Sequence, residues 1–216
     1  MLAIKQKPCD QRNYRTPRKG FINYIVLHYT AGNGDTDEQN GNYFAGRDTN
    51  DTSAHYFVDE DSITQSVSDL ACAFHCGGTT YKHPECRNDN AIGIEMCSDK
   101  DASGNYIITE DTVNNAVELT KYLMRLYSIK TDHVLRHYDV TGKSCPAPWV
   151  TNESLWLDFK KRLEAAPMPD QWKNDIMVEA QKEGLINGDH KPDDPASKWF
   201  VLAAGLALLK KMRGGK

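Results

Sequence analysis

The chain has 216 residues, a formal net charge of −4 and a pI near 6.0. It carries no basic tract, which argues against a nucleic-acid-binding protein, and no apolar run reaches the length that crosses a membrane. Residues 1–5 lack the basic head and the apolar segment of a signal peptide. We therefore expect a protein made in the cytoplasm that acts outside the cell only after release.

The first half of the chain predicts a strand, a helix and a hairpin. An apolar, β-branched run predicts a buried strand at 21–27, and a capping threonine followed by two acids predicts a helix over 36–45. Residues 53–58 and 62–67 predict the two strands of a hairpin. Residues 71–90 are rich in Gly, Cys, His and Asn without a clear period, which is typical of a long functional loop.

The second half predicts two helices and two further strands. Residues 91–97 predict a strand whose alternation places Ile, Ile and Met on one face and Ala, Gly and Glu on the other. Apolar residues at helical spacing predict the longest helix over 109–127, and residues 155–163 predict a second amphipathic helix. Between these helices we expect a strand at 133–136 and a loop over 139–150.

Three side chains that are distant in the sequence form a candidate metal site. His28 ends the first strand, and His137 precedes Cys145 by eight positions. Alone, His28 would more simply be a hydrogen-bonded histidine at a strand end. Together, two imidazoles and one thiolate predict a zinc ion with a fourth position left open for water, which is typical of a catalytic site. His133 is not expected to bind, because residues four apart in a strand are too far apart for one ion.

Two charged residues predict hydrolytic chemistry at this site. Glu95 lies on the nearly bare face of its strand, where apolar neighbours can raise the pKa of a carboxyl group that acts as a general base. Lys143, two residues before Cys145, can stabilise the oxyanion that forms when water attacks a carbonyl group. The simpler alternatives are a salt-bridged acid at Glu95 and a solvated lysine at Lys143.

Three polar residues are candidates for binding a substrate. His75 is followed closely by two glycines in the long loop, and His55 begins the hairpin. Asn90 and its neighbour Asp89 precede the strand that carries the candidate base, where they could bind a peptide by hydrogen bonds. A packed polar histidine is an equally good interpretation of His55.

The six cysteines do not need to form disulfide bonds. Their even number would allow a disulfide framework, but a chain of this size can bury a core without one. We therefore expect most of them to be free buried thiols. The spacing of Cys72, His75 and Cys76 is only weak evidence for a second metal site or a redox pair.

Five motifs occur together in one order. They cover residues 26–32, 53–58, 71–75, 90–97 and 136–146. Together they resemble the zinc N-acetylmuramoyl-L-alanine amidases of the amidase-2 type, a family that includes phage endolysins, bacterial autolysins and animal peptidoglycan-recognition proteins. The resemblance covers roughly residues 15–164. It implies an α/β fold with a central mixed β-sheet flanked by helices.

The resemblance also implies an activity on peptidoglycan, namely cleavage of the amide bond between the lactyl group of N-acetylmuramic acid and L-alanine. By position, His28, His137 and Cys145 match the zinc ligands of the family. Glu95 matches the catalytic acid and Lys143 the oxyanion-stabilising lysine. Some relatives carry a functional tyrosine where this chain has Ala54, and this difference puts more weight on Glu95.

Two other functions remain open at this point. Non-catalytic peptidoglycan-binding relatives typically lack the ligand cysteine, whereas Cys145 is present here. A thiol hydrolase that uses Cys145 and His137 is the second alternative. Among amidases, the missing leader and a short following module favour a phage endolysin over a bacterial autolysin.

The last fifty residues predict a separate module. Two prolines predict a linker at 165–169 that separates a catalytic domain, residues 1–164, from a small helical module at 170–216. The module weakly resembles half of an S-layer-homology-type wall-binding repeat. Its leucine-rich stretch would serve equally as a face for homodimerisation or as plain core.

Overall fold

The computed structural model describes residues 2–164, 177–178, 180–182, 184 and 186. Contacts divide the chain into two units, Met1–Ala165 and Ala166–Lys216. The predicted linker at 165–169 lies outside the described residues. So does most of the predicted C-terminal module at 170–216, together with its wall-binding and dimerisation predictions.

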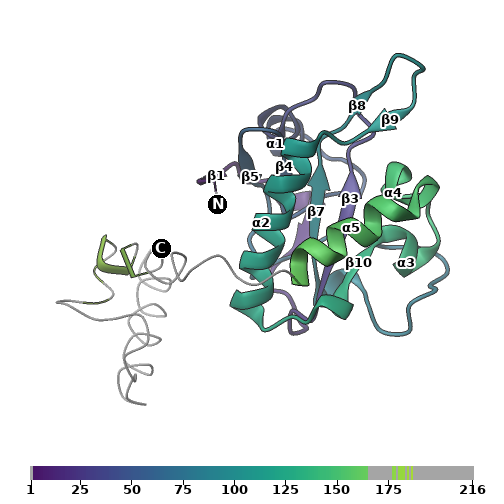
Figure 1. Ribbon diagram of the computed structural model, residues 1–216. Coiled ribbons are helices and arrows are strands. Elements are labelled where there is room, and N and C mark those ends of the chain that lie inside the picture. Colours follow the sequence, from purple (N-terminus) through teal and green to yellow (C-terminus); the bar gives the residue numbers. More distant parts are fainter. Residues whose placement is uncertain (1, 165–176, 179, 183, 185, 187–216) are drawn as a thin grey trace. The chain divides into compact units, whose positions relative to one another are not determined.

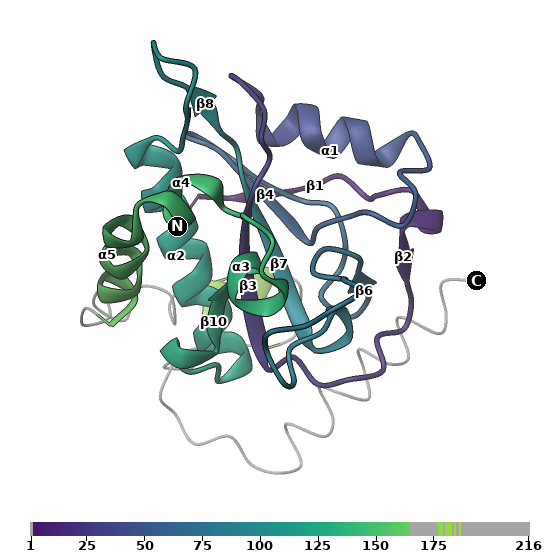
Figure 2. The same cartoon turned by 90° about the vertical axis from the view of Figure 1, so that its right-hand side faces the viewer.

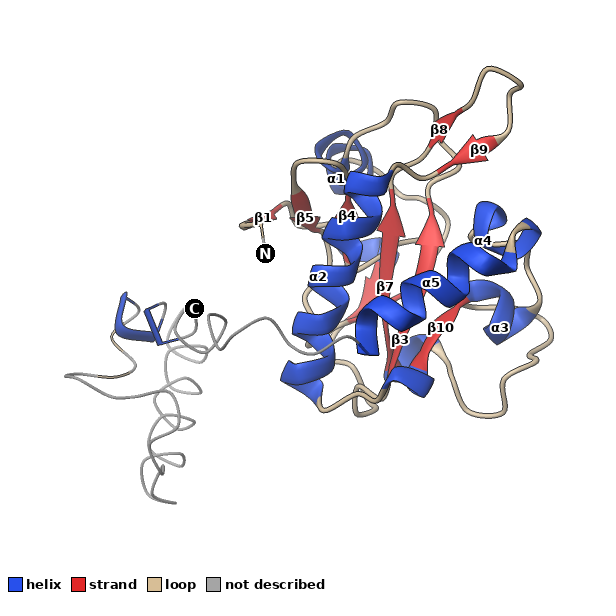
Figure 3. Ribbon diagram, viewed as in Figure 1, coloured by secondary structure: helices blue, strands red, loops and turns tan. Residues whose placement is uncertain are grey.

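A six-stranded mixed sheet forms the centre of the first unit (Figures 1 and 3). Only β4 and β5 pair in antiparallel fashion among its neighbouring strands, and the other four pairs are parallel. The strands run in the order β1 (Ile4–Gln6), β5 (Ile63–Gln65), β4 (Tyr56–Val58), β7 (Ala91–Met96), β3 (Tyr24–Tyr29) and β10 (Val134–Arg136). Two short ladders join β2 (Tyr14–Arg15) to β6 (Cys72–Ala73) and β8 (Asp99–Lys100) to β9 (Tyr106–Ile107).

Helices cover both faces of the sheet, which confirms the predicted α/β fold. Figure 2 shows α2 (Glu110–Tyr127) and α5 (Glu153–Glu164) on one side and α1 (Asp37–Ala45) with β6 on the other. The described part also contains the 3₁₀ turns η1 (Gln11–Asn13), η2 (Asn88–Asn90) and η3 (Thr131–His133). No helix in the described part of the chain is both long and apolar enough to cross a membrane.

Local sequence explains the bounds of the long helices. The Thr36 hydroxyl accepts a hydrogen bond from the Gln39 N–H and the Gln39 side chain bonds back, so a capping box begins α1, which ends at Ala45, before Gly46, as predicted. The Thr109 hydroxyl accepts a hydrogen bond from the Thr112 N–H and so caps α2 at the predicted boundary. The predicted hairpin is also present, although its strands are shorter than expected.

Alternation along β3 and β7 divides the two faces of the sheet. Five fully buried aliphatic side chains from these strands pack with α2 and α5 in the main core: Ile25, Leu27, Ile92, Ile94 and Met96. Burying each such side chain contributes roughly 1.5–3 kcal/mol. Because side chains alternate, His28 and Glu95 lie on the opposite face, as the strand pattern predicts.

The predicted loop over 139–150 is wrong in part, because it contains two short helices. α3 (His137–Thr141) begins at His137 itself, and α4 (Ala147–Thr151) follows Pro146. Each helix has five residues, which is too short for apolar positions to show a helical period. The Asp139 carboxylate bonds back to the Arg136 N–H, and this contact fixes the first turn of α3.

Candidate metal centre

Parallel pairing brings the two predicted histidine ligands together. His28 is the fifth residue of β3, and β10 pairs with β3 so that Arg136 lies opposite Leu27. The next residue, His137, therefore leaves β10 beside His28 at the carboxyl edge of the sheet. The imidazole centroids are 4.8 Å apart.

Cys145 reaches this edge because α3 ends in a tight turn. Gly142 adopts the left-handed conformation, with φ +88°, and the chain then returns so that the Tyr138 N–H donates to the Cys145 carbonyl at 2.9 Å. The Cys145 Sγ lies 3.7 Å from His28 Nδ1. Ligand atoms of His28, His137 and Cys145 all lie within 4.8 Å of one another.

These three residues fit a metal ion by their chemistry and by their unsatisfied atoms. All three are buried, with exposed fractions of 4% or less. Among the described residues, both ring nitrogens of His137 are inaccessible and have no hydrogen-bond partner, which is costly without a ligand. A nitrogen and a sulfur bound to one tetrahedral zinc lie about 3.6 Å apart, close to the separation of His28 Nδ1 and Cys145 Sγ.

Burial keeps both imidazoles in the form that binds metals. The pKa of His28 is held well below its ordinary value of 6.5, first by burial and then by the neighbouring His75 and His137. Burial and the Lys143 charge lower the pKa of His137 to about 4. Both rings are therefore neutral at pH 7, and a neutral imidazole offers a lone pair to a cation.

Glu95 lies directly across from His28 in the β3–β7 ladder. Its Oε2 is inaccessible to solvent and has no hydrogen-bond partner within the described residues. Burial raises the pKa of this carboxyl group to about 8, the Lys143 charge opposes the rise, and the Asp35 charge adds to it. A carboxyl group with a pKa near neutrality can both accept and release a proton.

The Lys143 ammonium group acts on the whole cluster, although the residue is exposed. Its charge lowers the pKa values of His137, Glu95 and Cys145. Burial still raises the pKa of the Cys145 thiol to about 12. The Lys143 charge thus influences the protonation of the three predicted ligands and of Glu95.

The three predicted substrate-binding residues lie in different surroundings. His75 is buried beside His28, with its Nδ1 3.0 Å from His28 Nε2. His55 is fully buried, and its Nδ1 accepts a hydrogen bond from the Gly93 N–H at 3.0 Å. The Asn90 side chain accepts from the Arg87 N–H and donates to the Glu85 carbonyl, inside its own loop. Their roles towards a substrate stay predictions.

The sequence pattern missed two residues that shape the site. The Asn88 Oδ1 accepts hydrogen bonds from the N–H groups of His75 and Cys76, and so fixes the long loop against the sheet. The Arg18 guanidinium donates to the carbonyl groups of Asp69 and Asp89. Asn88 precedes Asp89 and Asn90, which the sequence analysis did select as candidates. Arg18 lies in the polar segment before the first predicted strand, where no motif marks it.

All six cysteines are free and buried, as predicted. The described residues contain no other group of three or more ligating side chains close enough to hold a metal ion. The weak pattern around Cys72 and Cys76 therefore does not form a second metal site there.

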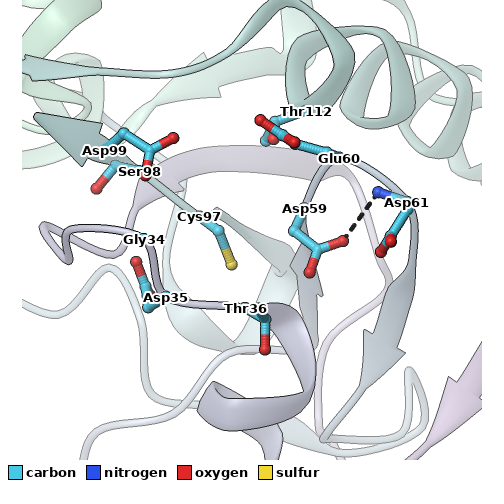
Figure 4. A pocket seen from close by; sticks show the side chains of 10 residues that line it. All are labelled: Gly34, Asp35, Thr36, Asp59, Glu60, Asp61, Cys97, Ser98, Asp99 and Thr112. Atoms are coloured by element: carbon cyan, nitrogen blue, oxygen red, sulfur yellow. Dashed lines mark hydrogen bonds between the residues drawn. The ribbon is translucent and has the colours of Figure 1, made fainter. Parts of the chain in front are cut away.

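A separate acidic cavity lies at the carboxyl ends of β3, β4 and β7 (Figure 4). Its volume is about 210 Å³, and its lining includes Asp35, Asp59 and Asp99 but none of the three candidate ligands. The Asp59 carboxylate accepts hydrogen bonds from the N–H groups of Asp61 and Asp37. The bond to the Asp37 N–H gives Asp59 a structural role, because it fixes the first residue of α1.

The mixed sheet and the His–His–Cys cluster at its carboxyl edge define an α/β domain with a candidate metal centre. The profile of the Amidase_2 family, N-acetylmuramoyl-L-alanine amidase, matches residues 17–148. The chain therefore belongs to this family, which confirms the resemblance of its five motifs. The match includes all three candidate ligands, Glu95 and Lys143.

Individual relatives agree with this assignment. A probable N-acetylmuramoyl-L-alanine amidase from Bacillus licheniformis is 37% identical over 149 residues, which cover 65% of this chain and 41% of the relative. A mutant endolysin from Bacillus subtilis has a similar structure, with 29% identity and a TM-score of 0.62 over 76% of this chain and 99% of that chain. The catalytic domain of XlyA is 28% identical, with a TM-score of 0.62 over 75% of this chain and 99% of that chain.

The chain spans about two fifths of the length of two curated relatives from Bacillus licheniformis, but nearly all of the two solved structures named above.

Proposed function

We propose that this chain is a zinc-dependent N-acetylmuramoyl-L-alanine amidase that cleaves peptidoglycan, and that it serves as a phage endolysin. The observation that carries the proposal is the buried cluster of His28, His137 and Cys145, with Glu95 opposite His28 on the neighbouring strand. Family membership and the similarity to an endolysin from Bacillus subtilis support it. A bacterial autolysin is the alternative within the same chemistry.

His28, His137 and Cys145 would hold the zinc ion. When bound there, zinc supplies a Lewis acid that polarises the lactyl carbonyl group and lowers the pKa of a water molecule towards about 7. The zinc charge would also favour the thiolate of Cys145 over the thiol that burial favours in the metal-free protein. The neutral imidazoles need no deprotonation before they bind.

Glu95 would move the proton in this reaction. Its carboxylate accepts a proton from the attacking water, and the resulting acid donates that proton to the amine of L-alanine as the C–N bond breaks. The lactyl carbon keeps the water oxygen as a carboxylate, and the peptide leaves with a free amino terminus. A nearby cation would lower the pKa of Glu95 from about 8 and thus favour the carboxylate that starts the cycle.

Lys143 would stabilise the negative charge that develops on the lactyl carbonyl oxygen. Its ammonium group already acts on His137, Glu95 and Cys145, so it lies within electrostatic reach of the reacting atoms. His75, His55 and Asn90 remain candidates for substrate binding. Of these three, His75 is the one whose ring contacts a candidate zinc ligand, His28.

Mass spectrometry of digested peptidoglycan tests the proposal. Purified cell wall is incubated with the protein, with and without a chelator, and then with added zinc. We expect new free amino termini on L-alanine and intact glycan strands, loss of this product with chelator, and recovery with zinc. The Glu95→Gln variant should bind zinc but turn over about 10²–10⁴ times more slowly.

The same experiment separates the two alternatives. A non-catalytic module would bind the wall without releasing peptide. A thiol hydrolase based on Cys145 would keep its activity in chelator and lose it on alkylation. Cleavage of a glycosidic or peptide–peptide bond would contradict the amidase assignment itself.

A further inference from the structure

The His28 imidazole is held between two partners, one at each ring nitrogen. Its Nδ1 lies 3.7 Å from the Cys145 Sγ, on the side of the candidate metal centre. Its Nε2 lies 3.0 Å from His75 Nδ1, with the two rings perpendicular at 90°. The ring is 1% exposed, so water cannot replace either partner.

This arrangement decides which nitrogen of His28 carries the proton. A neutral imidazole has one N–H and one lone pair, and a cation takes the lone pair. If the lone pair faces Cys145 at Nδ1, the proton must sit on Nε2 and needs an acceptor. The only ring nitrogen that the described residues place within hydrogen-bond distance of Nε2 is that of His75.

We propose that His75 is a positioning residue for the metal centre: its Nδ1 accepts the Nε2–H of His28 and thereby holds His28 in the tautomer that presents Nδ1 to the metal. This inference rests on the proposed zinc dependence. It differs from the predicted substrate-binding role of His75, because the side chain acts through a metal ligand. Hydrogen-bond partners of this kind orient metal-bound histidines and raise their basicity.

The position of the His75 ring depends on the absence of a side chain at Gly93. A β-carbon at this position would lie 2.5 Å from His75 Cγ and 2.7 Å from its Nδ1. The nearly bare face of β7, on which Glu95 lies, is therefore covered at Gly93 by the His75 ring. The ring lies flush against the strand that carries the candidate base.

The backbone around His75 is also fixed. Its N–H and that of Cys76 both donate to the Asn88 Oδ1, at 3.0 and 2.7 Å. The His55 ring packs edge-on against the His75 ring, with 5.6 Å between their centroids, and is itself fixed because its Nδ1 accepts a hydrogen bond from the Gly93 N–H. His75 thus has little freedom to rotate, which is what a residue that orients another side chain requires.

Nitrogen NMR of the metal-free wild-type chain tests the tautomer directly. Long-range proton–nitrogen correlations at pH 7 should show His28 as a single tautomer with its proton on Nε2. A proton on Nδ1, or an equal mixture of both tautomers, would overturn the proposal. This measurement needs no substitution, so it stands even if a variant fails to fold.

Zinc affinity tests the consequence for the metal centre. With a chromogenic chelator as competitor, His75→Ala should weaken zinc binding by about 10–100-fold. His75→Asn should recover most of the loss, because its amide oxygen can take the place of the Nδ1 acceptor. His133→Ala is the matched control, since this histidine bonds to the Asn23 carbonyl away from the cluster, and it should bind zinc as the wild type does.

The outcomes separate this inference from the proposed function. A folded His75→Ala protein with unchanged zinc affinity and a raised KM would overturn the positioning role in favour of substrate binding. A wild-type chain that binds no zinc would contradict the proposed zinc dependence instead. The His28 tautomer, compared between wild type and His75→Ala, would then decide the positioning role by itself: a single Nε2–H form that is lost in the variant supports it, and an unchanged tautomer refutes it.

Discussion

The substitution Glu95→Gln should remove a pH dependence from the folding stability of the metal-free protein. The Glu95 carboxyl group is buried, and its pKa rises from 4.5 to about 8 on folding. In the folded state it therefore holds a proton that the unfolded chain has already released at neutral pH. Glutamine has nearly the same shape and never ionises, so the variant lacks this difference.

The sign and the size follow from proton linkage. Because the folded pKa lies above the unfolded one, the contribution is fully present below pH 4.5 and is lost as pH rises to about 8. The loss amounts to about 1.4 kcal/mol per pH unit, or about 2 kcal/mol between pH 6.5 and 8. At pH 6.5 the unfolded chain still holds about half a proton on each histidine, so the lowered pKa values of the buried histidines His28, His55, His75 and His137 raise the stability by about 0.4 kcal/mol each up to pH 8, equally in the wild type and in Glu95→Gln. The raised pKa of Cys145 begins to act only above about pH 9.

Urea unfolding of chelator-treated protein at several pH values measures this effect. From pH 6.5 to 8 the stability of the wild type should fall by about 2 kcal/mol relative to that of Glu95→Gln, which should be the more stable protein at pH 8. Glu60→Gln, which alters an exposed carboxylate, should follow the wild type. Parallel stability curves for the wild type and Glu95→Gln would refute the raised pKa, and with it the argument that burial tunes this residue as an acid and base.

Three further predictions concern the site and its supports. Cys145→Ser should lose zinc affinity and the rise in melting temperature that zinc gives the wild type, as calorimetry with and without metal would show; tight zinc retention would point to another third ligand. Gly93→Ala should destabilise the domain by about 1–3 kcal/mol in urea unfolding, because a β-carbon would overlap an imidazole ring, and unchanged stability would contradict the close approach. Arg136→Met should cost about 2–4 kcal/mol, since its side chain is 6% exposed and bonds two carboxylates, whereas Arg162→Met should cost at most about 1 kcal/mol, because this side chain is 31% exposed and both of its carboxylate partners are more than half exposed; equal effects would contradict the difference in burial.

The sequence predicted well those features that depend on local chemistry. The capping threonines mark the first turns of α1 and α2. The alternation along β7 places Glu95 on the face opposite the main core. Residue type also reduced the number of candidate metal ligands, because imidazole and thiolate groups are typical ligands of zinc. The short helices α3 and α4 were missed, since one turn of helix is set by caps and tertiary contacts rather than by a period.

By itself, then, the sequence determined the candidate ligands and the candidate base, because residue type, motif order and strand alternation can be read from local segments, and it determined the fold class through the resemblance of its five motifs to a known family. Only the tertiary structure decided which side chains lie beside these residues. The parallel pairing of β10 with β3 set His137 beside His28. A loop more than forty residues after His28 in the chain placed the His75 ring against His28 and over Gly93. Contacts of this kind join segments that are distant along the chain, and neither composition nor spacing carries the direction in which a ring nitrogen points.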